Sequence, residues 1–426
     1  MKRRHVDLLL GLLHAAIACY LVYLTNDVQP TAYMDEYFHE KQTQAYLAGR
    51  WFEWDSKITT PPGLYLLTAV FLKPQEFFLK DAARQNLTVT QFRYFNALHL
   101  GVNAFLLSSI SSHLYRLPLP LHLLHITSIV TLPVLFFTSF FFYTDQVSLA
   151  AVLATALAFL SKGHLTTFFL ACFACAVRQT NIVWCACLVG MNIAFRLSSL
   201  CRKRGSSTKV SLFGWFLVLL RSPVQIIRAV FKGIVYDAPL LTVVGGLFMA
   251  FVWWNGGIVL GDRSSHEFTL HLPQLLYFLA FCAAQTPLRF ILFLLQLARS
   301  LFTPRRLLLL LFLLLSLTAF SIASVHCCTV AHKYILADNR HYTFYVWQRL
   351  FQRYSAFRYV CRYFIVPFVV WRLLTAPNSA TVPVAWLIAV SEVFLNVAVN
   401  CITVYVFLYK PFFWNSQASI PQRFMW

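Results

Sequence analysis

Charged side chains are scarce in this chain. Of its 426 residues only 15 are Asp or Glu, and charged residues of both signs make up 12%, about half of what a soluble domain carries. This scarcity excludes an ordinary soluble globular domain. Hydrophobic residues make up 59% instead, and the mean hydropathy is +0.64.

Long apolar runs make up much of the sequence. Runs such as 240–260, 272–297 and 307–325 each reach the ~20 residues that a helix needs to cross a bilayer. Irregular segments and open strand edges cannot face lipid. We therefore predict an all-α, polytopic membrane protein with about 11 or 12 transmembrane helices.

Two further features are missing from the sequence. No small-residue cleavage site precedes Met34, so we expect the apolar run 6–24 to be a retained first span and not a cleaved signal peptide. No internal repeat, low-complexity tract or polar domain interrupts the pattern. This predicts one integral membrane domain over residues 1–426.

Basic residues outnumber acidic ones, 35 to 15, which gives a net charge of +20. They lie in short loops between apolar runs, a pattern typical of cytosolic loops and of contact with anionic lipid headgroups. We therefore expect membrane lipid and no nucleic acid as a partner. Lys2–Arg4 places the N-terminus in the cytosol together with the basic loop 197–238, so loops 25–62, 261–272 and 326–342 face the other side, where a lumen would lie.

The middle of the chain allows two topologies. The polar run Arg178–Asn181 divides the apolar stretch 165–196 and suggests two helices that meet at the non-cytosolic surface. Parity then requires 122–143 to enter and return, which leaves Asp145 on that same side. A plain crossing at 122–143 with one tilted helix at 165–196 fits equally well, and we favour the broken form.

The only glycosylation sequon begins at Asn86. It falls between the expected second span, which starts near Gly63, and the third. The sequon is therefore predicted to be cytosolic and to carry no glycan.

Cysteine usage gives no metal signature. Most of the eleven cysteines lie within expected spans, and Cys172-x-x-Cys175 has no second pair, so small buried hydrophobic side chains are the better interpretation. No Asp-x-Asp motif occurs. No cofactor is required by the sequence, although Asp35, Glu36 and Asp145 could host a divalent metal.

Asp35 and Glu36 form an acidic pair directly after the first span. With so few acids in the chain, two adjacent ones at a membrane surface predict a catalytic loop in which one carboxylate takes up a proton. Asp35 is our first choice for the base and Glu36 its rival. The alternative is an interfacial acid that pairs with Lys41.

Four polar clusters are expected on the non-cytosolic face: 33–39 with 54–63, 178–181, 255–274 and 332–342. They could bind substrate and phosphate together, or each could be a solvated loop. Arg340 could bind phosphate or pair with Asp338, and Asp262 and Arg263 could simply close a tight loop. The substrate-binding candidates are Arg178, Asp262, Arg263, His266, Glu267, Lys333, Asp338, Arg340 and His341, and the secondary candidates are His39, Asp55, Asp145 and His332.

Several of these motifs resemble one family in collinear order from residue 33 to the end of the sequence. The chain is similar to the dolichyl-phosphate-glucose-dependent α-1,2-glucosyltransferases of the endoplasmic reticulum. Thr60-Pro61-Pro62-Gly63 stands where that family usually has Thr-Leu-Pro-Gly, a change that should stiffen the following helix. The matching segments are 34–36, 58–60, 62–65, 178–181, 255–267, 271–274, 332–347 and 422–426.

The resemblance implies a multi-span GT-C-type enzyme that adds the third and last glucose to the lipid-linked oligosaccharide for N-glycosylation. Its donor would be dolichyl-phosphate-glucose, its acceptor a dolichyl-diphosphate oligosaccharide, and its active site luminal. Such an inverting transfer needs one carboxylate as base, in the place of Asp35 or Glu36. The leaving phosphate would be stabilised by fixed cationic donors, for which the candidates are Arg178, Lys333, Arg340 and His341.

Three other functions compete with this interpretation. Interfacial charge also marks transporters and channels, but the polar density here is one-sided and no span carries a ladder of charges. A non-catalytic assembly subunit would tolerate loss of the Asp35 carboxylate. A related α-1,3-glucosyltransferase or mannosyltransferase is separated from this family only by the motifs.

Overall fold

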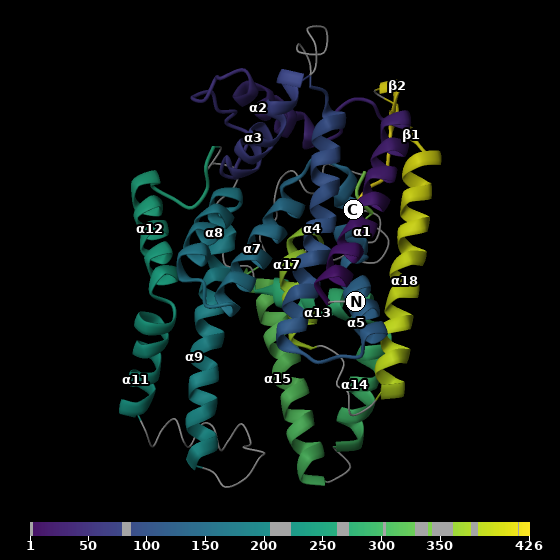
Figure 1. Cartoon of the computed structure of the whole chain (residues 1–426). Helices are drawn as coiled ribbons and strands as arrows, with labels where there is room; N and C mark the ends of the chain where they lie inside the picture. The colour runs from purple at the N-terminus through teal and green to yellow at the C-terminus, as the bar shows by residue number, and fades with distance from the viewer. Residues whose placement is uncertain are drawn as a thin grey trace.

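The computed structural model of the protein describes residues 3–78, 87–204, 223–261, 272–300, 304–328, 340–342, 361–375, 382–415 and 417–426. Most of these residues are helical, and the longer helices run roughly along one axis (Figure 1). The main helices are α1 (Arg3–Val28), α2 (Glu36–Leu47), α3 (Gly63–Phe78), α4 (Val89–Leu114), α5 (Leu119–Val130), α6 (Pro133–Phe137), α7 (Thr144–Leu160), α8 (His164–Val177), α9 (Ile182–Arg204), α11 (Pro223–Lys232), α12 (Pro239–Asn255), α13 (Pro273–Gln285), α14 (Pro287–Ser300), α15 (Pro304–Cys328), α17 (Ile365–Leu374) and α18 (Val382–Tyr409). Short helical turns are η1 (Thr138–Phe140), η2 (Gln179–Asn181), η3 (Gly233–Asp237) and η4 (Cys361–Phe364), and the strands are β1 (Phe412–Trp414) and β2 (Gln417–Gln422).

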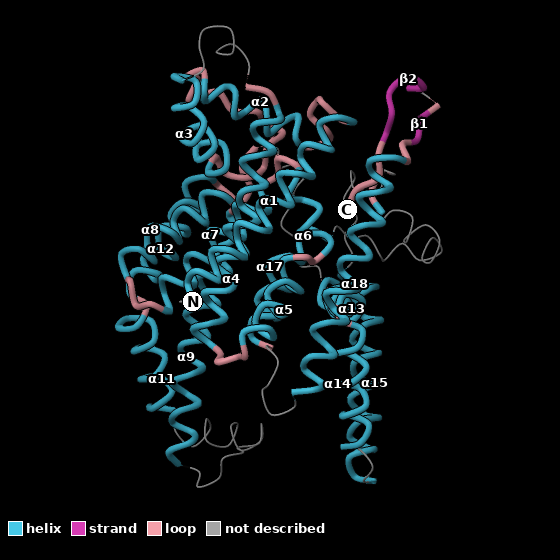
Figure 2. Tube along the Cα trace, turned by 45° about the vertical axis from the view of Figure 1, so that its right-hand side comes forward, coloured by secondary structure: helices cyan, strands magenta, loops and turns pink. Residues whose placement is uncertain are grey.

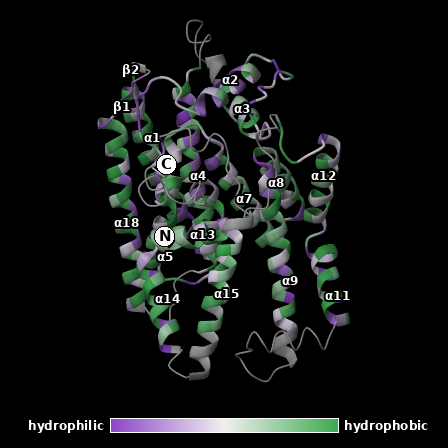
Figure 3. Ribbon diagram, turned by 180° about the vertical axis from the view of Figure 1, so that it is seen from behind, coloured by the Kyte–Doolittle hydropathy of each residue, from purple (hydrophilic) through white to green (hydrophobic). Residues whose placement is uncertain are grey.

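One end of the bundle carries α2, α3 and the strand pair β1–β2 (Figures 1 and 2). We call it the site end, made of residues 29–62 and 412–426, because Asp35 immediately precedes α2. Figure 3 shows hydrophilic residues gathered near α2 and α3, whereas most of the helices below them are apolar. The polar segments of the sequence are thus concentrated at one end.

Several helices are fit to cross a membrane. Among the described residues, Arg4–Val28, Gln179–Ser199 and Pro383–Tyr409 are each long and apolar enough, and three bent helix pairs meet the same criterion. The pairs α5–α6, α11–α12 and α13–α14 bend by 68°, 88° and 108°. Each second helix begins with a proline, which lacks the N–H that would continue the preceding helix.

The prediction of an all-α polytopic membrane protein is confirmed. The exception is the small antiparallel pair β1–β2, in which Phe412 lies opposite Gln422 and which no apolar pattern foretold. The number of spans, about 11 or 12, stays a prediction.

Helices α1 and α4 pack against each other through glycine. A Cβ added to Gly101 would lie 2.5 Å from the carbonyl oxygen of Gly11, and one added to Gly11 would lie 2.8 Å from that of Gly101. Small residues at a helix crossing allow the backbones to approach closely. This contact fixes the two helices that support the site end, because the last residues of α1 and the first turns of α4 both reach it.

The expected second span is wrong. Leu87, which follows α3, accepts a hydrogen bond from Gln44 Nε2 of α2 at 3.3 Å, so the chain is still at the site end after α3. Helix α3 packs its apolar face on neighbours such as Tyr46 and Phe95 and does not cross the bundle. Asn86 lies outside the described residues; Leu87, the next residue, is at the same end as Asp35.

Because α3 does not cross, the topology of the middle of the chain also differs from the expected one. Helix α4 leads away from the site end to Tyr115, whose hydroxyl donates to Leu374 O at the opposite end. Residues 119–143 then cross back, since Phe142 N donates to Glu36 Oε1 at 2.7 Å. The predicted entry and return of 122–143 is therefore wrong, whereas the predicted break of 165–196 into two helices is confirmed by α8, η2 and α9. Both features fit together because α3 does not cross.

Candidate active site at the site end of the bundle

Glu36 is fully buried in the first turn of α2. Its carboxylate accepts hydrogen bonds from Tyr33 N at 2.9 Å and Phe142 N at 2.7 Å. Arg93 of α4 adds two more, from Nε to Oε1 at 2.9 Å and from Nη2 to Oε2 at 2.6 Å. With four donors around it and no exposed surface, this carboxylate is a structural anchor that no acceptor hydroxyl can reach.

Arg93 also has a hydrogen-bond acceptor for each of its N–H groups. Beyond Glu36, its Nη1 donates to Asn26 Oδ1 and Gln29 O, and its Nη2 donates to Thr31 O. All five guanidinium N–H groups are therefore used. A buried ion pair needs such additional hydrogen bonds to offset the loss of hydration, and here they fix the loop 26–36 onto α4.

Asp35 lies beside this anchor and differs from it in environment. It is partly exposed and follows Met34, whose φ of 56° is in the left-handed region that non-glycine residues rarely adopt. The chain turns sharply there, and the Asp35 carbonyl accepts the first backbone hydrogen bonds of α2, from Phe38 N and His39 N. The anchored Glu36 thus holds its neighbour Asp35 at the start of a helix at the surface of the site.

Tyr65 lies within the electrostatic influence of both Asp35 and Arg178. Its hydroxyl lies 2.8 Å from His39 Nδ1 and its side chain is fully buried. Burial raises the pKa of the Tyr65 phenol and a hydrogen bond with Thr60 opposes this, while the negative charge of Asp35 adds a smaller rise and the positive charge of Arg178 a smaller decrease. Both charged groups therefore lie close to one phenol.

Arg178 sits at the break between α8 and η2. Its Nη1 is 3.0 Å from Asp145 Oδ1 of α7, and the two side chains are 19% and 1% exposed. No described residue donates a hydrogen bond to the Asp145 carboxylate, so the contact is electrostatic and imperfectly aligned. The next residue, Gln179, donates to Thr59 O at 2.8 Å and ties this break to the loop 54–63.

The motif that starts at Asn255 also reaches this loop. Gly261 has a φ of 72°, and an added Cβ would lie 2.3 Å from Ser56 O and 2.5 Å from Ile58 O. Only glycine fits such a close approach in that conformation. The stretch that continues into Asp262 therefore begins against the loop that follows Asp35.

Arg340 lies beside Tyr33 and Trp414. Its guanidinium lies over the rings of Tyr33 and Trp414, 5.5 and 5.1 Å from their centroids. Its neighbour His341 has Nδ1 3.1 Å from Trp426 O. Tyr33 is two residues before Asp35, so Arg340 and His341 belong to the same end of the bundle.

The structure thus brings together the following predicted residues: Asp35, Glu36, His39, Asp145, Arg178, Arg340 and His341. Asp55 lies in the same loop but shapes a turn, since its Oδ1 accepts Lys57 N at 2.9 Å. The remaining predicted residues, Asp262, Arg263, His266, Glu267, His332, Lys333 and Asp338, lie outside the described residues. In the part of the chain that the structure describes, no group of three or more His, Cys, Asp or Glu side chains could hold a metal ion.

Sequence reasoning missed Arg93, Tyr65 and Tyr33. The one available signal was Arg93, the only Asp, Glu, Lys or Arg in the stretch 89–114, which normally marks a buried partner or a site. The tyrosines carried no signal, because tyrosine is ordinary near a membrane surface.

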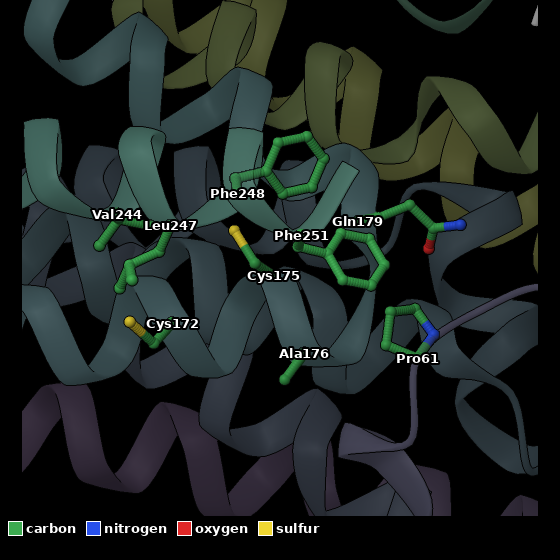
Figure 4. A pocket seen from close by; sticks show the side chains of 9 residues that line it. All are labelled: Pro61, Cys172, Cys175, Ala176, Gln179, Val244, Leu247, Phe248 and Phe251. Atoms are coloured by element: carbon green, nitrogen blue, oxygen red, sulfur yellow. The ribbon is translucent and has the colours of Figure 1, made fainter. Parts of the chain in front are cut away.

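An apolar cavity of about 250 Å³ opens beside the site between α8 and α12. Figure 4 shows its lining, with Cys172 and Cys175 of α8 facing Leu247, Phe248 and other residues of α12. Pro61 and Gln179 lie together at one end of it, and Ala176 and Phe251 complete the wall near them. The cavity thus runs from apolar helix faces to the residue that follows Arg178.

Fold and site together define a polytopic membrane protein with carboxylates and arginines gathered at one end of an apolar bundle. The family model described as the DIE2/ALG10 family matches residues 29–407. The chain belongs to this family.

Relatives from several organisms resemble the chain over nearly its whole length. A protein of Mus musculus is 32% identical and one of Homo sapiens 33% identical, each over 96% of both chains. A Drosophila melanogaster protein is 33% identical over 92% of this chain and 93% of its own. All three bear the name Dol-P-Glc:Glc(2)Man(9)GlcNAc(2)-PP-Dol alpha-1,2-glucosyltransferase.

Proposed function

We propose that this protein transfers glucose in α-1,2 linkage from dolichyl-phosphate-glucose to the diglucosylated lipid-linked oligosaccharide, with Asp35 as the base. Membership of the DIE2/ALG10 family is the main support for this reaction. Relatives matched over 96% of both chains are named for this donor and this acceptor. The carboxylate and arginine groups at the site end supply the chemistry that such a transfer needs. No observation favours a transporter, a non-catalytic subunit or a different linkage.

Asp35 takes the proton. The acceptor hydroxyl attacks C1 of the donor glucose while its proton passes to the Asp35 carboxylate, and the bond from C1 to the phosphate oxygen breaks. Dolichyl phosphate leaves with the bonding electrons, and a β-linked donor gives an α-linked product by inversion. One carboxylate suffices for a single displacement, and Glu36 has its oxygens engaged by Arg93 and two backbone N–H groups.

Arg178 and Arg340 bind the donor phosphate in this proposal. The leaving group carries developing negative charge, which fixed guanidinium groups stabilise with paired N–H donors. Arg178 lies near Tyr65 together with Asp35, and Arg340 lies over the Tyr33 ring. His341 and, outside the described residues, Lys333 are further candidates for the same phosphate.

The apolar cavity between α8 and α12 takes the first isoprene units of the donor. Its lining is almost entirely apolar, and Gln179 at its end directly follows Arg178. A polyprenyl phosphate has this same order of groups, an apolar chain joined to one anionic head. The site end would then face the lumen of the endoplasmic reticulum, on the side opposite the basic N-terminus.

Cells that lack this protein test the function. We expect them to accumulate the diglucosylated lipid-linked oligosaccharide, and the wild-type gene should restore the triglucosylated form. Accumulation of an unglucosylated or monoglucosylated species would move the protein to another step. An unchanged oligosaccharide profile would contradict the proposal.

A further inference from the structure

The segment 412–426 folds back onto the site end. Strands β1 and β2 pair antiparallel, and the residues after β2 continue inward, since Gln422, Arg423 and Met425 are all buried. The Arg423 guanidinium donates to Phe407 O and Leu408 O at the end of α18 and to Val28 O at the end of α1. A cation at the carbonyl ends of two helices stabilises both, so this segment has one fixed place.

Its backbone holds Tyr33. The Tyr33 hydroxyl donates to Arg423 O at 2.7 Å and accepts from Arg423 N at 2.8 Å. Tyr33 is buried, and its own N–H donates to the anchored Glu36. The tyrosine is therefore fixed at its hydroxyl by the segment 412–426 and at its backbone by the loop that carries Asp35.

The same segment holds Arg340. Met425 N donates to Arg340 O at 2.9 Å, and Tyr342 N donates to Met425 O at 3.0 Å, which forms a parallel bridge between His341 and Met425. Arg340 Nη1 donates to Gln422 Oε1 at 3.2 Å. Its guanidinium also lies over both Tyr33 and Trp414.

We infer that the segment 412–426 is a positioning element of the active site: Trp414, Gln422 and Tyr33 hold the Arg340 guanidinium where it meets the donor phosphate. This inference rests on the proposed function, because it assigns Arg340 to that phosphate. Aromatic faces orient a planar cation and leave its edge N–H groups able to donate. A guanidinium fixed in this way loses less side-chain entropy when the phosphate binds.

Kinetics of the purified full-length protein test the inference, with donor and acceptor concentrations varied separately. Trp414→Ala removes one aromatic face and should raise the KM for dolichyl-phosphate-glucose by about two- to tenfold, with the KM for acceptor unchanged. Trp414→Phe keeps an aromatic face and should restore most of the donor affinity. Phe413→Ala is the matched control, because Phe413 is the neighbouring residue of β1 and is 55% exposed; it should behave as wild type.

A second variant covers the case in which Trp414→Ala does not fold. Tyr33→Phe keeps the ring under Arg340 but loses both hydrogen bonds to Arg423, and it should also raise the donor KM selectively. The inference is overturned if the folded Trp414 or Tyr33 variant has the donor KM of wild type, or if donor and acceptor KM rise equally. It is likewise overturned if Trp414→Phe is as impaired as Trp414→Ala. Failure of the wild-type protein to transfer glucose would instead overturn the proposed function, whereas an active wild type with an inactive Asp35→Asn leaves that function standing whatever the Trp414 result.

Discussion

The Glu36 carboxylate and the Arg93 guanidinium form a fully buried, two-point ion pair, 2.6 Å apart at their closest atoms. This pair joins α2 to α4 across 57 residues of sequence. It separates the environments of two adjacent acids: the Glu36 carboxylate is buried against Arg93, whereas Asp35 is partly exposed. The loop geometry therefore depends on this buried ion pair.

Glu36→Gln should destabilise the protein because it leaves the Arg93 charge buried without its partner. Breaking a buried pair costs about 3–5 kcal/mol, and thermal unfolding in detergent should show a lowered Tm. Glu40→Gln is the matched control one turn along α2. Burial raises the pKa of Glu40 and the nearby charge of Glu36 adds to this, so loss of that carboxylate should leave Tm unchanged or slightly higher. Equal Tm values for the Glu36 and Glu40 variants would contradict the anchoring role.

Asn86 should carry a glycan, contrary to the topology expected from the sequence. Leu87, the next residue, accepts a hydrogen bond from Gln44 of α2 and is at the end of the bundle proposed to face the lumen. Endoglycosidase treatment should shift the mass of the wild-type protein but not that of Asn86→Gln. Thr88→Ser keeps the sequon and should keep the shift. A wild-type protein without a shift would place α3 across the membrane after all.

Arg340→Lys should weaken use of the donor more than use of the acceptor. Lysine keeps the charge but loses the planar fork that binds phosphate at two points and stacks on Tyr33 and Trp414. Steady-state kinetics with each substrate varied should show a raised donor KM. A change confined to the acceptor KM would assign the phosphate to Arg178 instead.

A bulky residue in the apolar cavity should discriminate between donors with and without the first isoprene units. Leu247→Trp fills space between α8 and α12, so the KM for dolichyl-phosphate-glucose should rise while that for an analogue with a methyl group in place of the isoprene units stays constant. Met249→Trp is the control on the same helix, since Met249 is 67% exposed and does not line the cavity. A Leu247→Trp effect that is the same for both donors would place the polyprenyl chain elsewhere.

The sequence predicts the membrane class correctly, and it predicts that several candidate site residues lie at one end of the bundle, for physical reasons. Apolar length and scarce charge are direct consequences of the lipid environment, and polar runs such as Arg178–Asn181 stand out against it. These signals located Asp35, Arg178 and Asp145 at one end of the bundle.

The other features of the fold and of the candidate site depend on long-range contacts, which the spacing of residues in the sequence does not predict. Helix α3 is apolar enough to resemble a span, but its apolar face is buried against α2 and α4. Arg93 and Glu36 are 57 residues apart, and Tyr33 meets Arg423 across 390 residues. No local pattern reveals such partners, so the anchor and the folded-back segment 412–426 emerge only in three dimensions.

The most direct test of the account is glucose transfer by purified protein from dolichyl-phosphate-glucose to the diglucosylated acceptor, with wild type compared with Asp35→Asn. The account predicts transfer by wild type and a loss of about two to four orders of magnitude in kcat for Asp35→Asn, with donor binding and Tm preserved. Glu53→Gln is the control, since this acid of the same loop is exposed and forms an ion pair with the exposed Arg50, and it should remain fully active. Wild-type turnover by Asp35→Asn, or no transfer by the wild-type protein, would contradict the account.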